Sequence, residues 1–331
     1  MTGGANHVPV LLHEVLAALA PRDGATYVDA TFGAGGYSAA LLEAARCRVL
    51  GIDRDPDALR RAAPLAARHQ GRLIVIEGRF GDLERLVAPV SPEPIAGVAF
   101  DLGVSSMQLD SPQRGFSFRT DGPLDMRMGR EGESAADLVA RLSEPELAAL
   151  IRELGEERHA RRVARAIVTA RAREPVRRTA QLAEIVRAAI PGREPGLDPA
   201  TRTFQALRIA VNDELGEIDR GLAAAERLLM PSGRLAVVAF HSLEDARVKS
   251  FLRQRSGAAG SGSRHLPPAP STPRPSFTLL TRRAIRPAAD EVARNPRARS
   301  ARLRTAERSA AVPWPAPSAS GRISIPAETA R

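Results

Sequence analysis

Short apolar runs of strand length alternate with longer helical stretches through the N-terminal third of the chain. The runs are apolar at consecutive positions, which is typical of strands that are buried on both faces of a parallel sheet. Four such strands are predicted, at residues 27–33, 48–53, 73–76 and 95–102. Their alternation with helices predicts an α/β fold in which helices cover a parallel sheet.

The alternation stops after Gly103, and residues 110–216 carry several helical patterns and no further convincing strand. A fifth buried strand is predicted at residues 234–240, after a Pro-Ser-Gly turn. Just beyond it, Ser242 and Asp245 have the spacing of a helix cap and its partner. The simplest arrangement is one sheet with a helical domain inserted between its fourth and fifth strands.

The chain therefore divides into four predicted parts. Residues 1–109 form the first part of the α/β domain, residues 110–216 the inserted helical domain, residues 217–308 the second part of the α/β domain, and residues 309–331 a disordered tail. Within the second part, a Gly-, Ser- and Pro-rich stretch at residues 254–276 predicts a mobile loop, and residues 277–285 are a candidate last strand.

Composition restricts the classes of protein to which this chain can belong. Its 331 residues are enough for two domains, and 44% hydrophobic with 26% charged residues is typical of a soluble globular protein. No apolar run approaches the ~18 residues needed to cross a bilayer, and the N-terminus lacks the pattern of a signal peptide. The single cysteine, Cys47, excludes an internal disulfide framework and a multi-cysteine metal site. We therefore expect a cytoplasmic protein with no membrane partner and no metal requirement.

Positive charge is concentrated at the C-terminal end. Residues 253–331 hold 15 of the 48 basic residues and 4 of the 38 acidic ones, so they carry +11 while residues 1–252 carry −1. Only one basic residue is a lysine, Lys249, and arginine suits bidentate contacts with phosphate. A tail of this sign favours a polyanionic partner through counterion release. A solvated tail without a partner is the alternative.

A glycine-rich turn between the first predicted strand and its helix is a candidate cofactor site. Residues 33–38 read Gly-Ala-Gly-Gly-Tyr-Ser, and glycines here let the backbone turn sharply and approach a ligand closely. Asp53 follows Gly33 by twenty residues, at the end of the second predicted strand. A carboxylate there can accept hydrogen bonds from both hydroxyls of an adenosine ribose. The combination indicates a nucleoside cofactor.

Two cofactors compete for this turn. A dinucleotide fingerprint requires a third glycine where Ser38 stands, and the strand carries an acid of its own, Asp29, four residues before Gly33. An acid ahead of such a turn is typical of S-adenosylmethionine enzymes, whose cofactor has no pyrophosphate for a helix N-terminus to bind. These features favour S-adenosylmethionine over NAD, and a tight turn without a ligand is the remaining alternative.

Several long motifs resemble the ribosomal RNA small subunit methyltransferase H family. The most specific is DLGVSSMQLD at residues 101–110, and others lie, in order, at residues 7–12, 114–128, 155–158, 201–209, 240–245 and 295–304. The resemblance implies a class I S-adenosylmethionine-dependent methyltransferase fold, Rossmann-like with a mostly parallel sheet, whose inserted helical domain recognises the substrate. It also implies a bacterial enzyme that methylates the exocyclic N4 of a cytidine at the decoding centre of 16S rRNA, in the small ribosomal subunit.

The resemblance further implies a set of cofactor contacts. By motif these are Gly33, Gly35, Gly36, Tyr37, Asp53, Phe80, Asp101 and Gln108. Asp53 would bind the ribose, and Phe80 would lie against adenine unless it only caps the core. The family usually has His where this chain has Tyr37. A cofactor contact through the ring would therefore differ from that of the family, whereas a contact through the backbone would not.

A carboxylate is expected to assist methyl transfer. The methyl group on a sulfonium is already activated, so the enzyme must chiefly align it with the nucleophile. A cytosine amine is a poor nucleophile, and an acceptor for N4–H would localise its lone pair and relieve positive charge in the transition state. We predict Asp101 as this acceptor, with Ser105 or Asp125 as second candidates. Asp101 could instead pair with the methionine ammonium, and Asp125 could be a turn residue.

Arginines and aromatic rings in the inserted domain are candidate RNA contacts. They are Arg114, Phe116, Phe118, Arg119, Arg158, Arg161, Arg162, Arg165 and Arg202. The two phenylalanines would stack on an exposed target base, or would anchor their loop in the core. Four of the arginines, from Arg158 to Arg165, share one helix face opposite Val163 and Ile167. That face would contact phosphates, or would be a solvated surface.

Three other functions stay open on the sequence alone. A DNA amino-methyltransferase of the same fold usually carries a (Asp/Asn/Ser)-Pro-Pro-aromatic motif after the fourth strand, where this chain has Asp101-Leu102-Gly103-Val104. A ribosome-assembly factor that binds RNA without catalysis would not need an intact glycine turn with Asp53 and Asp101. A Rossmann dehydrogenase would need the missing third glycine.

Overall fold

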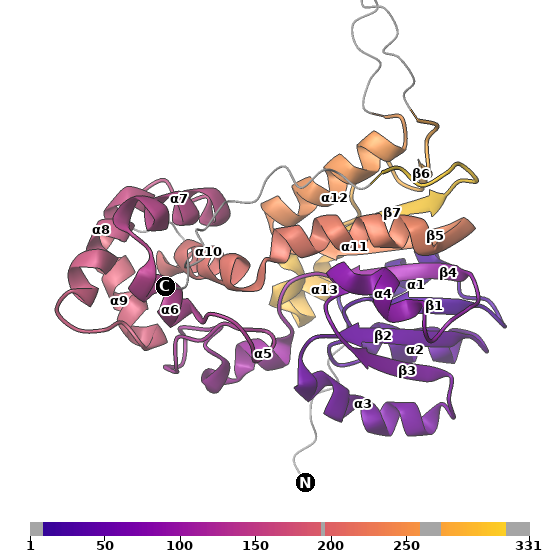
Figure 1. The fold of residues 1–331 in the computed structure, drawn as a ribbon, viewed down its shortest axis with the longest axis horizontal. Coiled ribbons are helices and arrows are strands. Elements are labelled where there is room, and N and C mark those ends of the chain that lie inside the picture. The colour runs from indigo at the N-terminus through magenta and orange to yellow at the C-terminus, as the bar shows by residue number, and fades with distance from the viewer. Residues whose placement is uncertain (1–8, 193–195, 259–272, 316–331) are drawn as a thin grey trace, which may run out of the picture. The chain divides into compact units, whose positions relative to one another are not determined.

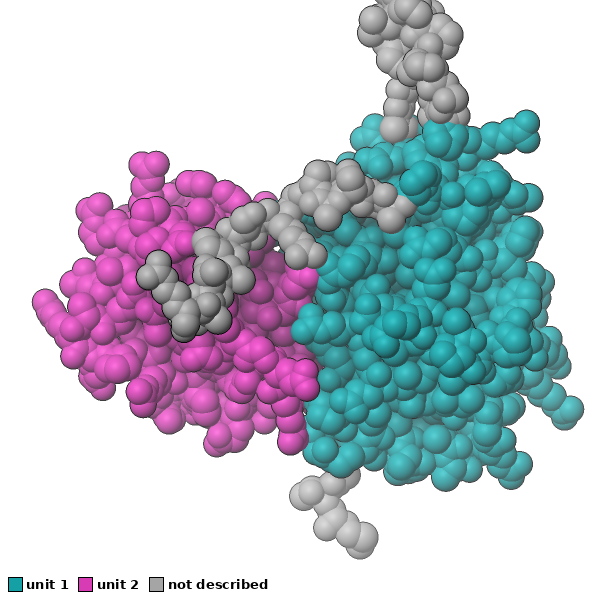
Figure 2. Space-filling view, viewed as in Figure 1, with its two compact units in different colours: residues 1–103, 215–317 teal, residues 104–214, 318–331 magenta. Residues whose placement is uncertain are grey.

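The computed structural model describes residues 9–192, 196–258 and 273–315. The chain divides into two compact units (Figure 2). Unit 1 comprises Met1–Gly103 and Leu215–Pro317, and unit 2 contains Val104–Glu214, which are inserted in the sequence of unit 1. Within the described ranges, no helix is both long enough and apolar enough to span a membrane.

Unit 1 is built on a seven-stranded sheet in the order β3-β2-β1-β4-β5-β7-β6 (Figure 1). The strands are β1 Thr26–Asp29, β2 Arg48–Asp53, β3 Leu73–Glu77, β4 Ile95–Asp101, β5 Leu229–Ala239, β6 Phe277–Leu279 and β7 Arg302–Arg308. Neighbours among β1–β5 are parallel, whereas β7 is antiparallel to both β5 and β6. The strand order reverses between β1 and β4, and ligands of open α/β sheets bind at the carboxyl ends of strands at such a point.

Helices cover both faces of this sheet (Figure 1). On one face, α1 Leu12–Leu19, α2 Gly36–Ala44, α3 Pro56–Arg68 and the short η3 Pro296–Ser300 share a buried core with Tyr27, Val49 and Val238. On the other, α4 Leu83–Val87, α11 Glu214–Leu228 and α12 Ser242–Arg255 pack with Leu50, Phe100 and Val237. Because side chains alternate along a strand, adjacent apolar residues such as Val49 and Leu50 enter opposite cores. The remaining elements are η1 Phe80–Asp82 and α13 Ala289–Arg294.

Unit 2 consists of helices and the loops that connect them. The helices are α5 Ser106–Asp110, η2 Pro112–Arg114, α6 Ala135–Arg141, α7 Glu144–Gly155, α8 Ala160–Arg171, α9 Thr179–Ala189 and α10 Ala200–Asn212. The buried side chain of Asn212 fixes the long loop before α6, since it donates to the carbonyl of Met126 at 2.7 Å and accepts from the N–H of Met128 at 2.9 Å. Such a satisfied buried amide holds a loop in one conformation.

The strand pattern in the sequence located the parallel part of the sheet well. β2 has its predicted bounds, and β3 and β4 differ from theirs by one residue. β5 begins at Leu229, five residues before its predicted start, so the predicted Pro-Ser-Gly turn is part of the strand. The first strand ends at Asp29 rather than residue 33, because the chain turns into the glycine loop. β7 was not predicted. Its buried positions are interleaved with arginines, so the segment lacks the apolar run of a central strand.

The C-terminal predictions need correction. Of the predicted last strand at 277–285, only residues 277–279 form β6, and Ile285 makes an isolated bridge to Leu303. The predicted disordered tail is wrong for its first residues, since the N–H of Trp314 donates to Glu226 at 2.9 Å. Of the predicted loop at 254–276, Gln254 and Arg255 belong to α12, and residues 259–272 lie outside the described residues. Residues 316–331 of the tail also lie outside them.

Candidate cofactor site and catalytic residues

The glycine loop of unit 1 runs from β1 into α2, where the sequence predicted it. Gly35 has φ 77°, a conformation that L side chains rarely adopt, and a Cβ there would lie 2.6 Å from Cζ of Phe32. A Cβ on Gly36 would lie 2.1 Å from Cγ of Pro9. The close contact at Gly36 is therefore with Pro9 of the protein itself. The sequence predicted close approach to a ligand and did not predict this contact.

Asp29 holds the start of this loop. Its side chain is buried and accepts hydrogen bonds from the Ser38 hydroxyl at 2.7 Å and from the N–H of Thr31 at 3.4 Å. Burial raises the pKa of Asp29 to about 6. The nearby charge of Asp53 also raises this pKa, whereas the hydrogen bonds from Ser38 and Thr31 lower it. Asp29 thus joins the end of β1 to the first turn of α2. Ser38, which replaces the third glycine of a dinucleotide fingerprint, has a definite role here.

Asp53 ends β2 and also binds the loop. One carboxylate oxygen accepts from the N–H of Gly33 at 2.7 Å, and the other accepts from the N–H of Asp55 at 2.8 Å. Burial raises the pKa of Asp53, although both backbone hydrogen bonds act in the opposite direction. Each oxygen has a second acceptor position, so both can still bind ribose hydroxyls.

Phe80 follows β3 in η1 and is half-buried. Its ring meets the ring of Phe100 edge-on, with centroids 5.7 Å apart, and a Cβ on Gly221 of α11 would lie 2.7 Å from it. One part of the ring therefore belongs to the core, and the partly exposed remainder is available to a flat ligand.

Asp101 ends β4 with an unsatisfied carboxyl group. Its backbone N–H donates to the Thr31 hydroxyl at 2.6 Å, which ties β4 to the glycine loop. Its Oδ1 is buried and has no hydrogen-bond partner among the described residues. Burial, together with the charges of Asp29 and Glu244, raises the pKa of Asp101 to about 8. A buried carboxyl oxygen without a partner is a candidate site for a hydrogen-bond donor or a cation of a ligand.

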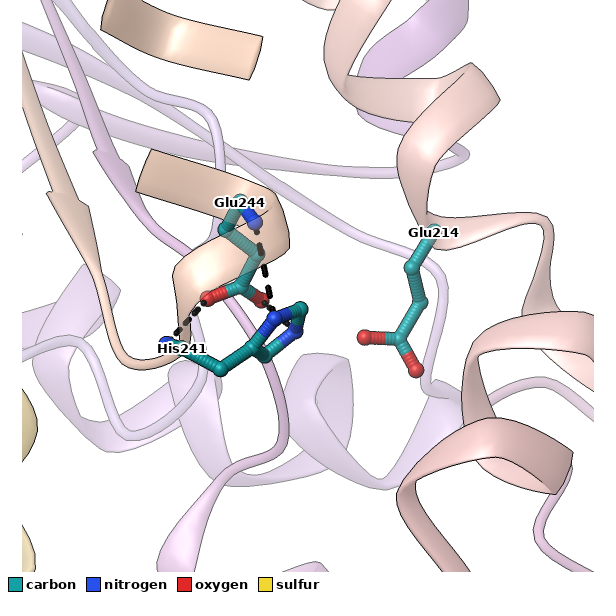
Figure 3. A group of neighbouring side chains, drawn as sticks. All are labelled: Glu214, His241 and Glu244. Carbon is teal, nitrogen blue, oxygen red and sulfur yellow. Dashed lines mark hydrogen bonds and ion pairs between the residues drawn. The ribbon is translucent and has the colours of Figure 1, made fainter. Parts of the chain in front are cut away.

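Glu244 and His241 lie at the start of α12 (Figure 3), and the charge of Glu244 acts on Asp101. Glu244 is fully buried and accepts from the N–H groups of Phe240 at 2.8 Å and His241 at 3.3 Å. Its other oxygen is 3.1 Å from Nε2 of His241. These two residues form the helix cap, so the predicted cap of Ser242 with Asp245 is wrong by one residue. The buried Glu244 is a site residue that sequence reasoning missed.

The ring of Tyr37 does not form part of the surface of the glycine loop. The side chain is buried in the core, and its hydroxyl donates to the carbonyl of Val10 at 2.5 Å. Burial, with the negative charges of Asp101 and Asp29, raises the pKa of Tyr37 well above its usual value. A ligand at the loop would therefore meet Tyr37 through its backbone, the second of the two possibilities left open by the sequence.

Three of the residues predicted to bind the cofactor or assist catalysis lie in unit 2 and have partners there. Ser105 and Gln108 form a reciprocal cap of α5, with N–H to side-chain oxygen distances of 3.2 Å and 3.0 Å. Both carboxylate oxygens of Asp125 bind the Arg127 side chain, at 2.9 Å and 2.7 Å. Burial raises the pKa of Asp125, but Arg127 more than offsets this and holds it below its usual value. Such an engaged carboxylate is a poor proton acceptor.

The candidate RNA residues of unit 2 divide into packed and exposed sets. Arg114 donates to the carbonyls of Arg127 and Met128, Phe116 is buried, and Phe118 packs edge-on against Phe204 at 4.8 Å. The exposed set comprises Arg119, Arg158, Arg161, Arg162 and Arg165, and Arg202 is half-buried 3.9 Å from Glu157. Val163 and Ile167 are fully buried, which confirms the predicted apolar face of α8. Arg158 was predicted on the opposite face, but it lies before the helix, which begins at Ala160.

The MraW methylase family is the sequence family that residues 4–309 match. The chain belongs to this family. Within it, the chain is 62% identical over 305 residues to the protein named Ribosomal RNA small subunit methyltransferase H of Rhodospirillum centenum, covering 92% of this chain and 93% of that one. It is 60% identical over 309 residues to the protein of the same name from Paramagnetospirillum magneticum, covering 93% and 97%.

Membership in the MraW methylase family confirms the resemblance drawn from the motifs. The mostly parallel sheet of unit 1, with helices on both faces, confirms the predicted α/β fold class. Among solved structures, an rRNA methylase from Streptococcus thermophilus is similar over 93% of this chain and 99% of its own, with 15% identity and a TM-score of 0.39. The chain is a methylase of the MraW family.

Proposed function

We propose that this chain transfers a methyl group from S-adenosylmethionine to the exocyclic N4 of a cytidine at the decoding centre of 16S rRNA, in the cytoplasm. The names of its relatives support the small-subunit rRNA as substrate. The amine target rests on one observation, the buried Oδ1 of Asp101 without a hydrogen-bond partner among the described residues. An exocyclic base amine supplies the donor that this acceptor lacks.

The carboxyl ends of β1, β2 and β4 suit S-adenosylmethionine. Asp53 has acceptor capacity for both ribose hydroxyls, and the partly exposed Phe80 offers its ring to adenine. The backbone of residues 33–36 would lie along the methionine part, as the motif implies. When bound, the cofactor supplies an electrophilic methyl group on a positively charged sulfur. The carboxyl groups of Asp29 and Asp101 favour a cationic ligand at this edge.

Asp101 is the residue that we assign to the target amine. Its Oδ1 accepts a hydrogen bond from N4–H, which localises the nitrogen lone pair and stabilises the positive charge that develops during transfer. Because its pKa is about 8, ionised Asp101 is basic enough near neutral pH to take the proton that the methylated amine must lose. The Thr31 hydroxyl holds the backbone of Asp101 in place meanwhile.

The exposed arginines of α8 are proposed to bind the RNA backbone. Arg161 and Arg162 are exposed and make no ion pair within the part of the chain that the structure describes. Phe116, Ser105, Gln108 and Asp125 are better assigned to holding the loops of unit 2, since each is buried or hydrogen-bonded within it. Arginine pairs well with phosphate through its planar set of donors.

The direct test is methylation of small ribosomal subunits from cells that lack this gene. Purified protein with labelled S-adenosylmethionine is expected to label one cytidine of 16S rRNA, and mass spectrometry locates the methyl group on the base amine. Asp101→Asn is expected to abolish turnover, and the exposed Glu43→Gln serves as the control. Methylation of a different base atom, or of duplex DNA in preference to subunits, would contradict the proposal.

A further inference from the structure

A basic groove in unit 1 lies away from the strand ends that carry the candidate cofactor site. It runs between α12 and the β6–β7 edge of the sheet, and its rim carries Lys249, Arg253, Arg282 and Arg304. Leu279 and Thr281 form part of its wall. We name it the Lys249 groove. None of the residues that line it is acidic.

Three of the four cations of the Lys249 groove lack acidic partners among the described residues. Lys249, Arg253 and Arg282 are exposed and form no ion pair within the described ranges. Lys249 and Arg253 are four residues apart on α12, where like charges repel and destabilise a helix. An uncompensated pair of this kind points to an anion from outside the chain.

The nearest acid on the same helix face is already neutralised. Asp245 lies one turn before Lys249, and its carboxylate binds Arg302 at 2.8 Å and Arg304 at 2.6 Å. This group of three therefore carries a net positive charge itself. The field in the Lys249 groove is positive from α12 and from β7 alike.

The groove also has room and a hydroxyl group for a phosphate. It encloses about 50 Å³, well above the ~10–15 Å³ that a single water needs. The Thr281 hydroxyl oxygen on its wall is buried and has no hydrogen-bond partner among the described residues. Threonine hydroxyls, lysines and arginines are the groups that proteins use to bind phosphate oxygens.

We propose that the Lys249 groove binds the sugar–phosphate backbone of the RNA that carries the target cytidine. The inference rests on the proposed function and adds a contact surface in unit 1 to the arginines of α8. Lys249 lies eight residues along α12 from His241, or about 12 Å at 1.5 Å per residue. Since His241 follows β5 at the edge that carries Asp101, a few nucleotides of single-stranded RNA would span the distance.

Lys249 provides a chemical probe of this contact, because it is the only lysine of the chain. An amine-acetylating reagent modifies Lys249 and the N-terminal amine, and peptide mass spectrometry measures each rate separately. A saturating single-stranded RNA with the sequence around the target cytidine is expected to slow acetylation of Lys249 about tenfold. The N-terminal amine is the internal reference. Equal acetylation rates for Lys249 with and without bound RNA would overturn the proposal.

A charge-neutralising variant tests the energetics. In Lys249→Gln/Arg253→Gln, two cations are lost, so the salt dependence of binding to single-stranded RNA should fall by about 1.4 in log–log slope. The Michaelis constant for small subunits should rise about tenfold, with an unchanged dissociation constant for S-adenosylhomocysteine as evidence of an intact fold. Arg68→Gln, an exposed cation at the end of α3, is the matched control.

The outcomes separate this inference from the proposed function. Wild-type protein that protects Lys249 with RNA but does not methylate subunits would contradict the proposed function and support the groove. Full methylation with the same Michaelis constant and salt slope in the double variant as in wild type would reject the groove and leave the proposed function intact.

Discussion

Asp53 accepts a hydrogen bond at 2.7 Å from the backbone N–H of Gly33, twenty residues earlier in the chain. The spacing of an acid after a glycine turn is usually explained by the ribose that the acid binds. Here the same carboxylate also fixes the turn, and a second N–H, from Asp55, fixes the carboxylate. The loop and the Asp53 carboxylate are therefore preorganised as one unit before any ligand arrives.

Asp53→Asn should weaken cofactor binding. The amide keeps one acceptor oxygen but loses the charge and the second acceptor, and a hydrogen bond to a charged group contributes about 1.5–3 kcal/mol. The dissociation constant for S-adenosylhomocysteine, measured by calorimetry, should rise about 10- to 100-fold. Exposed Glu43→Gln on α2 should bind as wild type does. Equal affinities in both variants would show that Asp53 serves the loop alone.

The pH dependence of ligand binding distinguishes two roles for Asp101. Its pKa of about 8 means that the group is largely protonated at pH 7 in the free protein. If Asp101 pairs with the methionine ammonium, S-adenosylhomocysteine should bind more tightly as the pH rises towards 8, and binding at pH 7 should release a proton. Calorimetry in buffers of different ionisation enthalpy counts this proton.

Under the proposal made above, Asp101 acts on the target amine instead. Affinity for S-adenosylhomocysteine should then change little between pH 6 and pH 9, whereas turnover should rise with pH and level off above about 8. A proton released on binding, abolished in Asp101→Asn, would assign the carboxylate to the cofactor.

Asp101→Asn should also stabilise the protein against unfolding. A carboxyl group with a pKa raised from 3.8 to about 8 favours the folded state in its protonated form. That contribution is complete below about pH 4 and is lost as the pH rises to 8. Asparagine stays neutral throughout, so the variant should exceed wild type in unfolding free energy by a few kcal/mol at pH 8. Urea unfolding at pH 4 and pH 8 measures the difference, and an equal gain at both values would refute the electrostatic cause.

The sequence revealed the parts of the site that depend on local pattern. Asp29, Gly33 and Asp53 could be located because a buried strand, a turn and a strand-end acid follow each other at fixed spacing. Glu244 could not, because its burial depends on the approach of α12 to the end of β4, which no short segment encodes. The motif at residues 240–245 indicated only the start of a helix, where capping residues of several kinds are possible.

The same distinction applies to strand β7. A central strand between β5 and β6 is expected to be apolar, but Arg302 and Arg304 point to one side and bind Asp245 of α12. Leu303 and Ala306 are fully buried and supply the apolar side chains. The alternation of charged with apolar residues is explained by the ion pairs with Asp245. Asp245 is distant in the sequence, so the residues of the strand alone do not reveal this partner.

Tyr37→Phe should separate structure from ligand binding. The variant leaves the buried carbonyl of Val10 without its donor, so the unfolding free energy should fall by about 1–3 kcal/mol. Tyr27→Phe is the matched control, since the Tyr27 hydroxyl also donates to a backbone carbonyl, that of Ala20 at 3.2 Å. Both variants should keep the wild-type affinity for S-adenosylhomocysteine. Weaker binding in Tyr37→Phe alone would restore a ring contact with the cofactor.

Glu226 of α11 is a buried acid of unit 1 that binds three partners from different segments. It binds Arg255 of α12 at 2.5 Å, the Ser276 hydroxyl at 2.6 Å and the N–H of Trp314 at 2.9 Å. Removing one partner of a buried pair leaves an uncompensated charge, which costs about 3–5 kcal/mol. Glu226→Gln should therefore lower the urea midpoint strongly, whereas Glu84→Gln, which breaks the exposed pair with Arg227, should cost at most about 1 kcal/mol.

A second variant keeps the Glu226 prediction testable if the first one fails to fold. Glu226→Gln/Arg255→Met removes both charges of this ion pair, so Arg255 no longer leaves an unpaired ion beside Phe251, over whose ring its guanidinium lies at 3.8 Å. The double variant should recover a large part of the stability lost in Glu226→Gln, because the penalty comes from the orphaned arginine rather than from the absent bond. Additive losses from the two substitutions would mean that Glu226 acts through Ser276 and Trp314, and that the ion pair contributes little.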